Sequence, residues 1–226
     1  MDLMSGEKKI PRETLAELQA AKIAPGKPLL LVDCDEVIVE FAGHLGRWLP
    51  TLGYELRLKK YELEGAIFPE GEADPVGFEA AINLINAFFE EETAHQAPIE
   101  GAVETLTRMA EAVQVVVLTN IPRHGRADRL INMQTIGLGT LPVVVNTGGK
   151  GRAIAWAAAQ AGATTVFVDD SPFQIASAAR HAEHVGRIHF RGATGLGNVL
   201  PKAPDADGEP ESWVACEEML RQRFRL

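Results

Sequence analysis

Polar side chains stand at the ends of short apolar segments, or at the start of the amphipathic segments that follow them. They are Asp33 and Asp35, Thr119 and Asn120, Lys150, and Asp169 and Asp170. Carboxylates gathered in one place repel one another, so a cation must hold them together. Oxygen donors favour a hard ion, and Mg²⁺ is the one we expect. Mg²⁺ with carboxylates and a lysine is a suitable receptor for a phosphate group.

The elements that must position these groups alternate between apolar strands and amphipathic helices. The predicted strands are 29–33, 113–119, 141–145, 165–169 and 186–190, and the predicted helices between them are 101–112, 126–134, 150–160 and 171–182. This alternation is typical of a parallel sheet covered on both faces. We therefore predict an α/β, Rossmann-like parallel sheet sandwiched by helices. Its site should lie at the carboxyl ends of the strands.

Residues 36–98 interrupt this rhythm. The segment is rich in aromatic residues, and its helical periodicity lies near 44–52 and 76–89. We interpret it as a small helical cap inserted after the first strand. The core then comprises residues 1–35 and 99–226, with helical extensions at 11–23 and 209–226.

Composition limits the classes of function. The 226 residues include 22 Lys and Arg against 31 Asp and Glu, a net charge of −9, which argues against general nucleic-acid binding. The two cysteines, Cys34 and Cys216, exclude a disulfide framework and favour a reducing cytoplasm. No apolar run reaches the roughly 18–20 residues of a membrane span. The expected partner is a small phosphorylated substrate, and either terminal helix could mediate a homodimer.

The ordered set of strand-end motifs resembles a known family. Leu31-Val-Asp-Cys-Asp-Glu-Val37, Leu118-Thr-Asn120, Lys150 and Phe167-Val-Asp-Asp170 are similar to the four motifs of the haloacid dehalogenase-like (HAD) superfamily. The resemblance covers roughly residues 28–191. A carboxylate at Asp35 indicates the phosphatase branch, because a departing halide needs no acid. The opening motif, residues 33–41, is most like that of the 5′(3′)-deoxyribonucleotidase group.

The resemblance implies a role for each motif residue. Asp33 matches the nucleophile that becomes an aspartyl-phosphate, and Asp35 matches the general acid and base. Thr119 matches the hydroxyl that binds the phosphoryl group, and Lys150 the neutralising cation. The implied metal ligands are Asp33, the backbone carbonyl of Asp35, and Asp169, with Asp170 holding a metal-bound water.

The region after Asp35 departs from the usual pattern of the superfamily at one position. Many members of the superfamily have glycine where this chain has Glu36, which changes the loop into the cap. We place Asn120, Phe41 and Trp48 among the substrate-binding residues. The two aromatic side chains would stack a nucleobase, or they would pack the core of the cap instead.

The leading hypothesis is a Mg²⁺-dependent phosphatase acting on a small phosphomonoester, with a nucleoside monophosphate as the first substrate. One alternative is a phosphotransferase or mutase that uses the same nucleophile. Another is a non-catalytic binding protein that retains the fold, since fold alone does not fix function.

Overall fold

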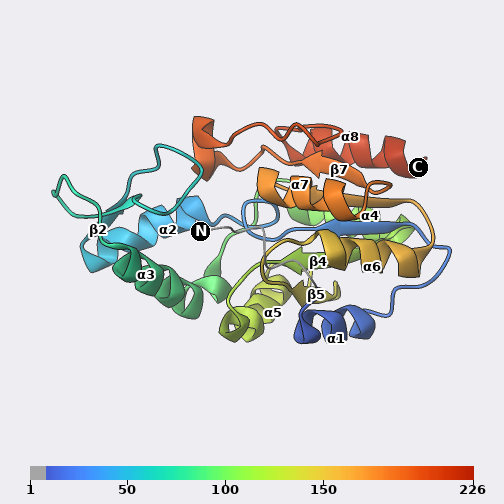
Figure 1. The fold of residues 1–226 in the computed structure, drawn as a ribbon, viewed down its shortest axis with the longest axis horizontal. Helices are drawn as coiled ribbons and strands as arrows, with labels where there is room; N and C mark the ends of the chain where they lie inside the picture. The colour runs from blue at the N-terminus through green and yellow to red at the C-terminus, as the bar shows by residue number, and fades with distance from the viewer. Residues whose placement is uncertain (1–8) are drawn as a thin grey trace.

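The computed structural model describes residues 9–226, which form a five-stranded parallel sheet between layers of helices (Figure 1). The strands are β1 (Leu29–Val32), β4 (Gln114–Thr119), β5 (Val143–Val145), β6 (Thr165–Asp169) and β7 (Gly186–His189). Their order is β5-β4-β1-β6-β7, and every neighbouring pair is parallel. The predicted α/β sheet is therefore confirmed, with β1 at its centre.

Successive residues of β1 point to opposite faces of the sheet, and each face has its own core. Leu29 and Leu31 pack in a cluster with side chains of α1 (Arg12–Ala20), α6 (Gly151–Ala161) and α7 (Pro172–His181). Leu30 and Val32 pack in a second cluster with side chains of α4 (Ala102–Ala112), α5 (Arg126–Thr135) and α8 (Trp213–Phe224). Because helices cover both faces, all four β1 side chains are fully buried, which explains the continuous apolar run.

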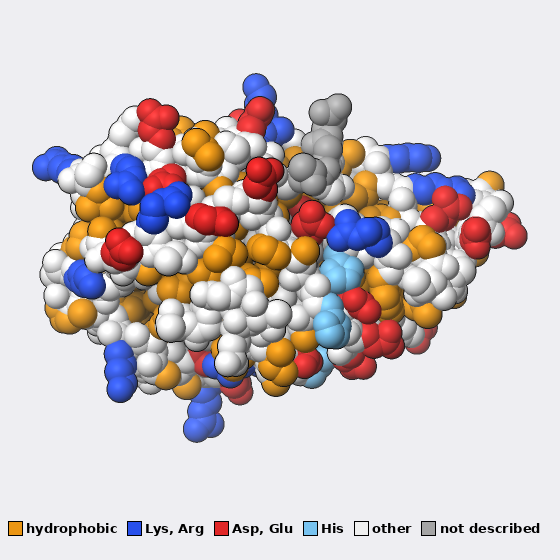
Figure 2. Space-filling model, turned by 180° about the vertical axis from the view of Figure 1, so that it is seen from behind, with side chains coloured by type: hydrophobic (Ala, Val, Ile, Leu, Met, Phe, Trp, Pro, Cys, Tyr) orange, Lys and Arg blue, Asp and Glu red, His pale blue; other side chains and the backbone are white. Residues whose placement is uncertain are grey.

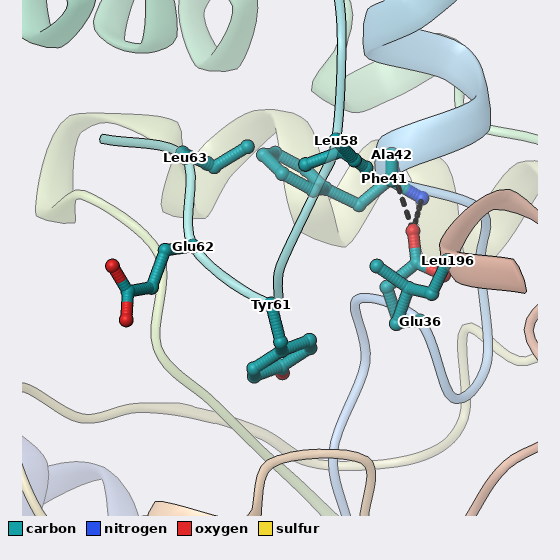
Figure 3. A pocket seen from close by; sticks show the side chains of 8 residues that line it. All are labelled: Glu36, Phe41, Ala42, Leu58, Tyr61, Glu62, Leu63 and Leu196. Carbon is teal, nitrogen blue, oxygen red and sulfur yellow. Dashed lines mark hydrogen bonds between the residues drawn. The ribbon is translucent and has the colours of Figure 1, made fainter. Parts of the chain in front are cut away.

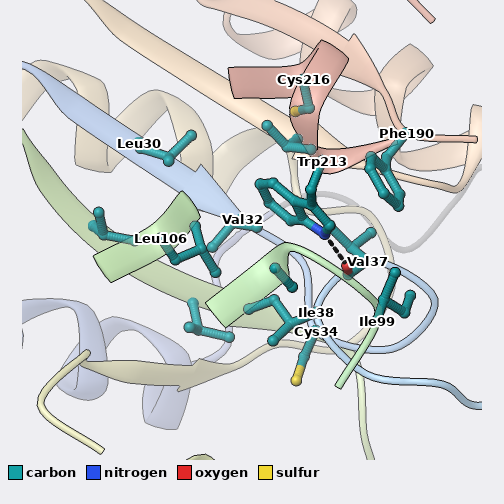
Figure 4. Packing of buried hydrophobic residues seen from close by; sticks show 14 of the residues in the cluster. Leu30, Val32, Cys34, Val37, Ile38, Ile99, Leu106, Phe190, Trp213 and Cys216 are labelled. Carbon is teal, nitrogen blue, oxygen red and sulfur yellow. Dashed lines mark hydrogen bonds between the residues drawn. The ribbon is translucent and has the colours of Figure 1, made fainter. Parts of the chain in front are cut away.

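Helix α8 supports the loop that follows β1. The indole Nε1 of Trp213 donates a hydrogen bond of 2.8 Å to the backbone carbonyl of Val37, two residues beyond Asp35 (Figure 4). The Trp213 ring also packs against Phe190, with ring centroids 5.2 Å apart. The C-terminal helix is thus part of the structure that holds the loop in place.

The insert after β1, which we call the cap segment (residues 36–98), packs around a small core of its own. It contains α2 (Ala42–Trp48), η1 (Leu49–Leu52), β2 (Tyr54–Leu56), β3 (Ile67–Pro69), α3 (Phe78–Glu91) and η2 (Thr93–His95). The antiparallel pair β2–β3 was not predicted, because three-residue strands are too short to show alternation. Two short helices of the core, η3 (Arg123–Gly125) and η4 (Thr194–Val199), complete the described elements.

The molecular surface is mixed in charge. On the face shown in Figure 2, basic and acidic side chains are interspersed among hydrophobic ones, and histidines gather beside acidic groups. Within residues 9–226, no helix has the length and apolar character needed to cross a membrane.

Candidate active site

The carboxyl ends of three adjacent strands bring most of the predicted site residues together. Strand β1 lies between β4 and β6, so Asp33, Thr119 and Asp169 end neighbouring strands. The backbone N–H of Asp33 donates to the carbonyl of Val168 at 2.9 Å, which extends the ladder to the candidate nucleophile. The hydroxyl of Thr119 is buried and has no hydrogen-bond partner among the described residues. A buried hydroxyl without a partner is expected where a ligand would complete the site.

Lys150 joins two of the carboxylates. Its Nζ lies 2.7 Å from Asp33 Oδ1 and 2.6 Å from Asp169 Oδ2, and Lys150 and Asp169 are almost completely buried. Burial by itself lowers the pKa of Lys150, but the charges of Asp169 and Asp33 outweigh it and raise that pKa above its ordinary value. Lys150 therefore carries a stable positive charge beside the candidate nucleophile.

Three carboxylates form a group that can hold a metal ion. Asp33, Asp169 and Asp170 each offer an oxygen, and the three oxygens lie within 4.8 Å of one another. Desolvation raises the pKa of Asp33 to about 7; Lys150 opposes this shift and Asp169 adds to it. Desolvation, followed by the charges of Asp169 and Asp33, likewise raises the pKa of Asp170. One lysine against three carboxylates leaves unbalanced negative charge, and an all-oxygen donor set fits a hard divalent cation such as Mg²⁺.

The buried carboxyl groups of Asp33 and Glu36 predict how the free energy of unfolding depends on pH. Asp33 and Glu36 have ordinary pKa values of 3.8 and 4.5, and burial raises each to about 7 in the folded protein. Between about pH 4.5 and 7 the folded protein keeps protons that the unfolded chain has lost. The free energy of unfolding of the metal-free protein should therefore fall as the pH rises through this window.

Binding of Mg²⁺ should restore the free energy of unfolding that the protein loses as the pH rises. Binding at a hundred times the dissociation constant adds about 2.7 kcal/mol, which corresponds to roughly 5–10 °C in Tm for a protein of this size. Thermal unfolding with Mg²⁺ or with chelator at pH 5 and pH 8 measures the effect, which should be larger at pH 8. Asp169→Asn should lose the Mg²⁺ shift, whereas Asp74→Asn, at an exposed position of the cap segment, should keep it. Equal Mg²⁺ shifts at both pH values would contradict the prediction.

Asp35 points to a different set of partners from Asp33. Its Oδ1 accepts hydrogen bonds from Gln96 Nε2 at 2.9 Å and from Arg129 Nη2 at 2.7 Å. Arg129 is fully buried in α5 and also donates to Gln96 Oε1 at 2.8 Å and Asn132 Oδ1 at 3.0 Å. Sequence reasoning missed Gln96 and Arg129. The available signal was weak: Arg129 lies on the same helical face as Asn132 and Met133, which are also buried.

Gln96 also connects Asp35 to the two linkers that join the cap segment to the core. Its Nε2 donates to the backbone carbonyl of Glu40 at 2.9 Å, in the linker that enters the cap. The two linkers pair through Glu40 N–H to Ala97 O, at 2.9 Å, and Ile99 N–H to Ile38 O, at 2.8 Å. The carboxylate of Asp35 is therefore fixed at the junction of cap and core.

Glu36 keeps the backbone conformation that glycine would adopt at this position. Its φ is +60°, in the left-handed region that glycine enters without strain. Its carboxylate is buried and accepts hydrogen bonds from the backbone N–H groups of Phe41, at 2.9 Å, and Ala42. Burial raises the pKa of Glu36 to about 7, although these two bonds oppose the shift. The departure from glycine thus anchors the first turn of α2.

The cap segment also reaches the carboxylate group through Tyr61. The phenol donates to Asp170 Oδ2 at 2.7 Å. Burial, together with the negative charges of Asp170, Asp169 and Asp33, raises the pKa of Tyr61, so the hydroxyl remains a donor.

The three predicted substrate-binding residues lie in different places. Phe41 lines a cavity between cap and core, whereas Trp48 packs against Phe88 inside the cap core, with ring centroids 5.6 Å apart. The structure therefore does not form the stacking slot that Phe41 and Trp48 together would have made. The amide of Asn120 donates to Gly148 O at 2.7 Å and accepts from Asn146 Nδ2 at 3.1 Å, which holds the loop before Lys150.

Comparison with solved structures identifies the fold. A conserved haloacid dehalogenase-like protein from Agrobacterium tumefaciens is 21% identical over 86% of this chain and 97% of its own, with a TM-score of 0.58. A HAD family hydrolase from Deinococcus radiodurans, with bound phosphate and sodium, is 18% identical over 90% and 98%, with a TM-score of 0.59. The chain has the haloacid dehalogenase-like fold.

The comparisons with protein families and with curated proteins gave no match. These comparisons give no specific support for the 5′(3′)-deoxyribonucleotidase group. The HAD-like fold and the buried Asp33–Asp169–Asp170 group are consistent with a phosphatase site.

Proposed function

We propose that this chain is a Mg²⁺-dependent phosphomonoesterase that forms an aspartyl-phosphate on Asp33. The observation that carries the proposal is the contact of Lys150 with Asp33 and Asp169, within a group of three buried carboxylates. An anionic nucleophile can approach an anionic phosphate only where positive charge offsets the repulsion. Here that charge comes from Lys150 and from the divalent cation that the carboxylates would hold.

In the first step an oxygen of Asp33 attacks phosphorus, and the bond from phosphorus to the ester oxygen breaks. The hydroxyl of Thr119, which lacks a partner among the described residues, donates to a phosphoryl oxygen. Lys150 stays beside both the nucleophile and the phosphoryl oxygens. When bound, Mg²⁺ supplies further charge neutralisation at the phosphoryl group.

Asp35 transfers a proton in each of the two steps of this mechanism. Both hydrogen bonds to its carboxylate fall on Oδ1, so Oδ2 is the oxygen proposed to give a proton to the departing alkoxide. In the second step the same oxygen takes a proton from water as that water attacks phosphorus. The bond between Asp33 and phosphorus then breaks, and inorganic phosphate leaves.

A phosphotransferase or mutase would use the same first step, and in the second step an alcohol would attack phosphorus in place of water. The motif at residues 33–41 resembles that of a nucleotidase group, but Trp48 is not beside Phe41 to complete a stacking slot for a nucleobase. A panel of phosphate esters that includes nucleotides and sugar phosphates, assayed for phosphate release with Mg²⁺, tests the proposal. No release from any ester would count against it, and a lag removed by a sugar bisphosphate would favour the mutase.

Turnover should require Mg²⁺ and be inhibited by Ca²⁺. A metal at such a site contributes several kcal/mol, so chelation should lower the rate by roughly a hundredfold or more. Ca²⁺ is larger and takes more ligands, so it should engage both oxygens of Asp33 and weaken the attack. Phosphate release is measured after chelation, and then after Mg²⁺ or Ca²⁺ is added back. Full activity of protein shown to be free of metal would contradict the prediction.

A further inference from the structure

A cavity of about 230 Å³ lies between the cap segment and the core (Figure 3). Its lining side chains are Glu36, Phe41, Ala42, Leu58, Tyr61, Glu62, Leu63 and Leu196. Leu58, Tyr61, Glu62 and Leu63 come from the loop between β2 and β3, and Leu196 comes from η4 of the core. The cavity is therefore lined by segments from both parts of the molecule.

The cavity adjoins the candidate active site. The ring of Tyr61 forms part of its wall, while the hydroxyl of the same residue bonds Asp170 Oδ2. Glu36, one residue after Asp35, forms another part of the wall. If a phosphate lies at Asp33, the alcohol portion of its ester can extend towards this cavity. This step rests on the proposed function.

The lining is mostly hydrocarbon, and within the described residues it contains no lysine or arginine. The carboxylate of Glu36 is already bound by the N–H groups of Phe41 and Ala42, and that of Glu62 by the ammonium of Lys60. A second phosphate or a carboxylate on the substrate would find no lysine or arginine in this lining to pair with. Apart from the second carboxylate oxygens of Glu36 and Glu62, the lining offers the polar edges of a sugar or nucleobase few partners.

We propose that the substrate is a phosphomonoester of a compact, uncharged, apolar alcohol, whose hydrocarbon portion occupies this cavity. The volume is below the roughly 300 Å³ at which pockets for drug-sized ligands begin, so the alcohol has only a few carbons. Phe41, Leu58 and Leu63 are the residues that select it.

A series of linear alkyl phosphates from propyl to octyl tests the proposal in the presence of Mg²⁺. The acidity of the leaving alcohol barely changes along this series, so differences in kcat/KM report binding of the alkyl chain. Each added methylene should raise kcat/KM about fourfold until the cavity is filled, after which the value should level off or fall. Glycerol 3-phosphate, ω-carboxyalkyl phosphates, phosphocholine and nucleoside monophosphates should be cleaved roughly tenfold to a hundredfold less efficiently than the best alkyl ester.

Leu63→Ala enlarges the cavity and should move the preferred chain to greater length. Leu52→Ala is the matched control, because Leu52 belongs to the same cap segment but is 47% exposed and does not line the cavity. The control should leave the chain-length profile unchanged, and equal Tm values show that both variants fold. A flat profile, a preference for a charged or polyhydroxylated ester, or the same shift in both variants would overturn the proposal.

A binding measurement separates this proposal from the proposed function. Linear alkyl phosphonates cannot be hydrolysed, so calorimetric titration with them measures how tightly the alkyl chain binds in the cavity without turnover. Their affinity should rise about fourfold per methylene, and Leu63→Ala should flatten that rise. If no ester is cleaved but this pattern holds, the proposed chemistry fails and the apolar site stands. If esters are cleaved without the pattern, the apolar site is wrong and the proposed chemistry stands.

Discussion

Asp33→Asn is expected to abolish phosphate release while leaving the protein folded. The amide keeps the shape of the side chain but lacks the anionic oxygen that attacks phosphorus. Because phosphate monoesters hydrolyse extremely slowly unaided, we expect the rate to fall by roughly 10⁴-fold or more. The substitution also removes one charge from the group formed with Asp169 and Asp170, so Tm at pH 8 should not fall.

Steady-state phosphate release and thermal unfolding together test this expectation. Intact-protein mass spectrometry of rapidly quenched reactions should show a phosphate adduct with the native enzyme and none with Asp33→Asn. Asp74→Asn, at an exposed position of the cap segment, should keep native activity as the matched control. Near-native turnover by Asp33→Asn on any ester that the native enzyme cleaves would remove Asp33 from the mechanism.

Asp35→Asn should damage both stability and catalysis, for separate reasons. The carboxylate is the counter-charge of Arg129, whose side chain is completely buried, whereas that of Asp35 is 18% exposed. Asparagine still accepts hydrogen bonds from Arg129 and Gln96 but leaves the guanidinium charge without a partner. Removing one member of such a pair costs about 3 kcal/mol, or roughly 6–12 °C in Tm for a protein of this size.

The catalytic loss should depend on the leaving group. An alkoxide leaves poorly without a proton, so alkyl esters should be cleaved much more slowly by Asp35→Asn. Nitrophenolate leaves unaided, so the first step with nitrophenyl phosphate should be nearly unchanged. Water attack in the second step still needs a base, so a burst of nitrophenol followed by slow turnover is expected. Equal slowing of the first step for both esters, in single-turnover kinetics, would show that Asp35 is not the general acid.

The double variant Asp35→Asn with Arg129→Met separates the two effects. Removing the buried guanidinium removes the unpaired charge, so the double variant should be more stable than Asp35→Asn alone. Its leaving-group dependence should stay that of Asp35→Asn, because the proton donor is still missing. Additive losses of stability would mean that the two residues are not energetically coupled.

The sheet could be predicted from the sequence because its central strands are buried on both faces. The run 29–32 is continuously apolar for that reason, and the alternating helices fix the strands as parallel. Parallel strands present their carboxyl ends at one edge, so the proximity of Asp33, Lys150 and Asp169 could be anticipated from their order along the chain.

Other parts of the site have little local signal in the sequence. The bond between Arg129 and Asp35 joins residues 94 apart in the chain, and a charged residue in an amphipathic helix usually indicates a solvated face. Tyr61 and Trp48 are both aromatic residues of the cap segment. One of them bonds a core carboxylate and the other packs inside the cap, which depends on the tertiary packing of short elements. Spacing alone does not distinguish these two outcomes.

The hydrogen bond from Trp213 to Val37 has a consequence for biosynthesis. It links residues 176 positions apart, so the loop after Asp35 gains this support only when α8 has left the ribosome. A nascent chain that has emerged as far as β7 already contains all five strands of the sheet. Synthesis proceeds from the N-terminus, and such a chain can begin to assemble its core early. The loop that follows Asp35 is then among the last parts of the core to become rigid, because this support is added only after the whole sheet has been synthesised.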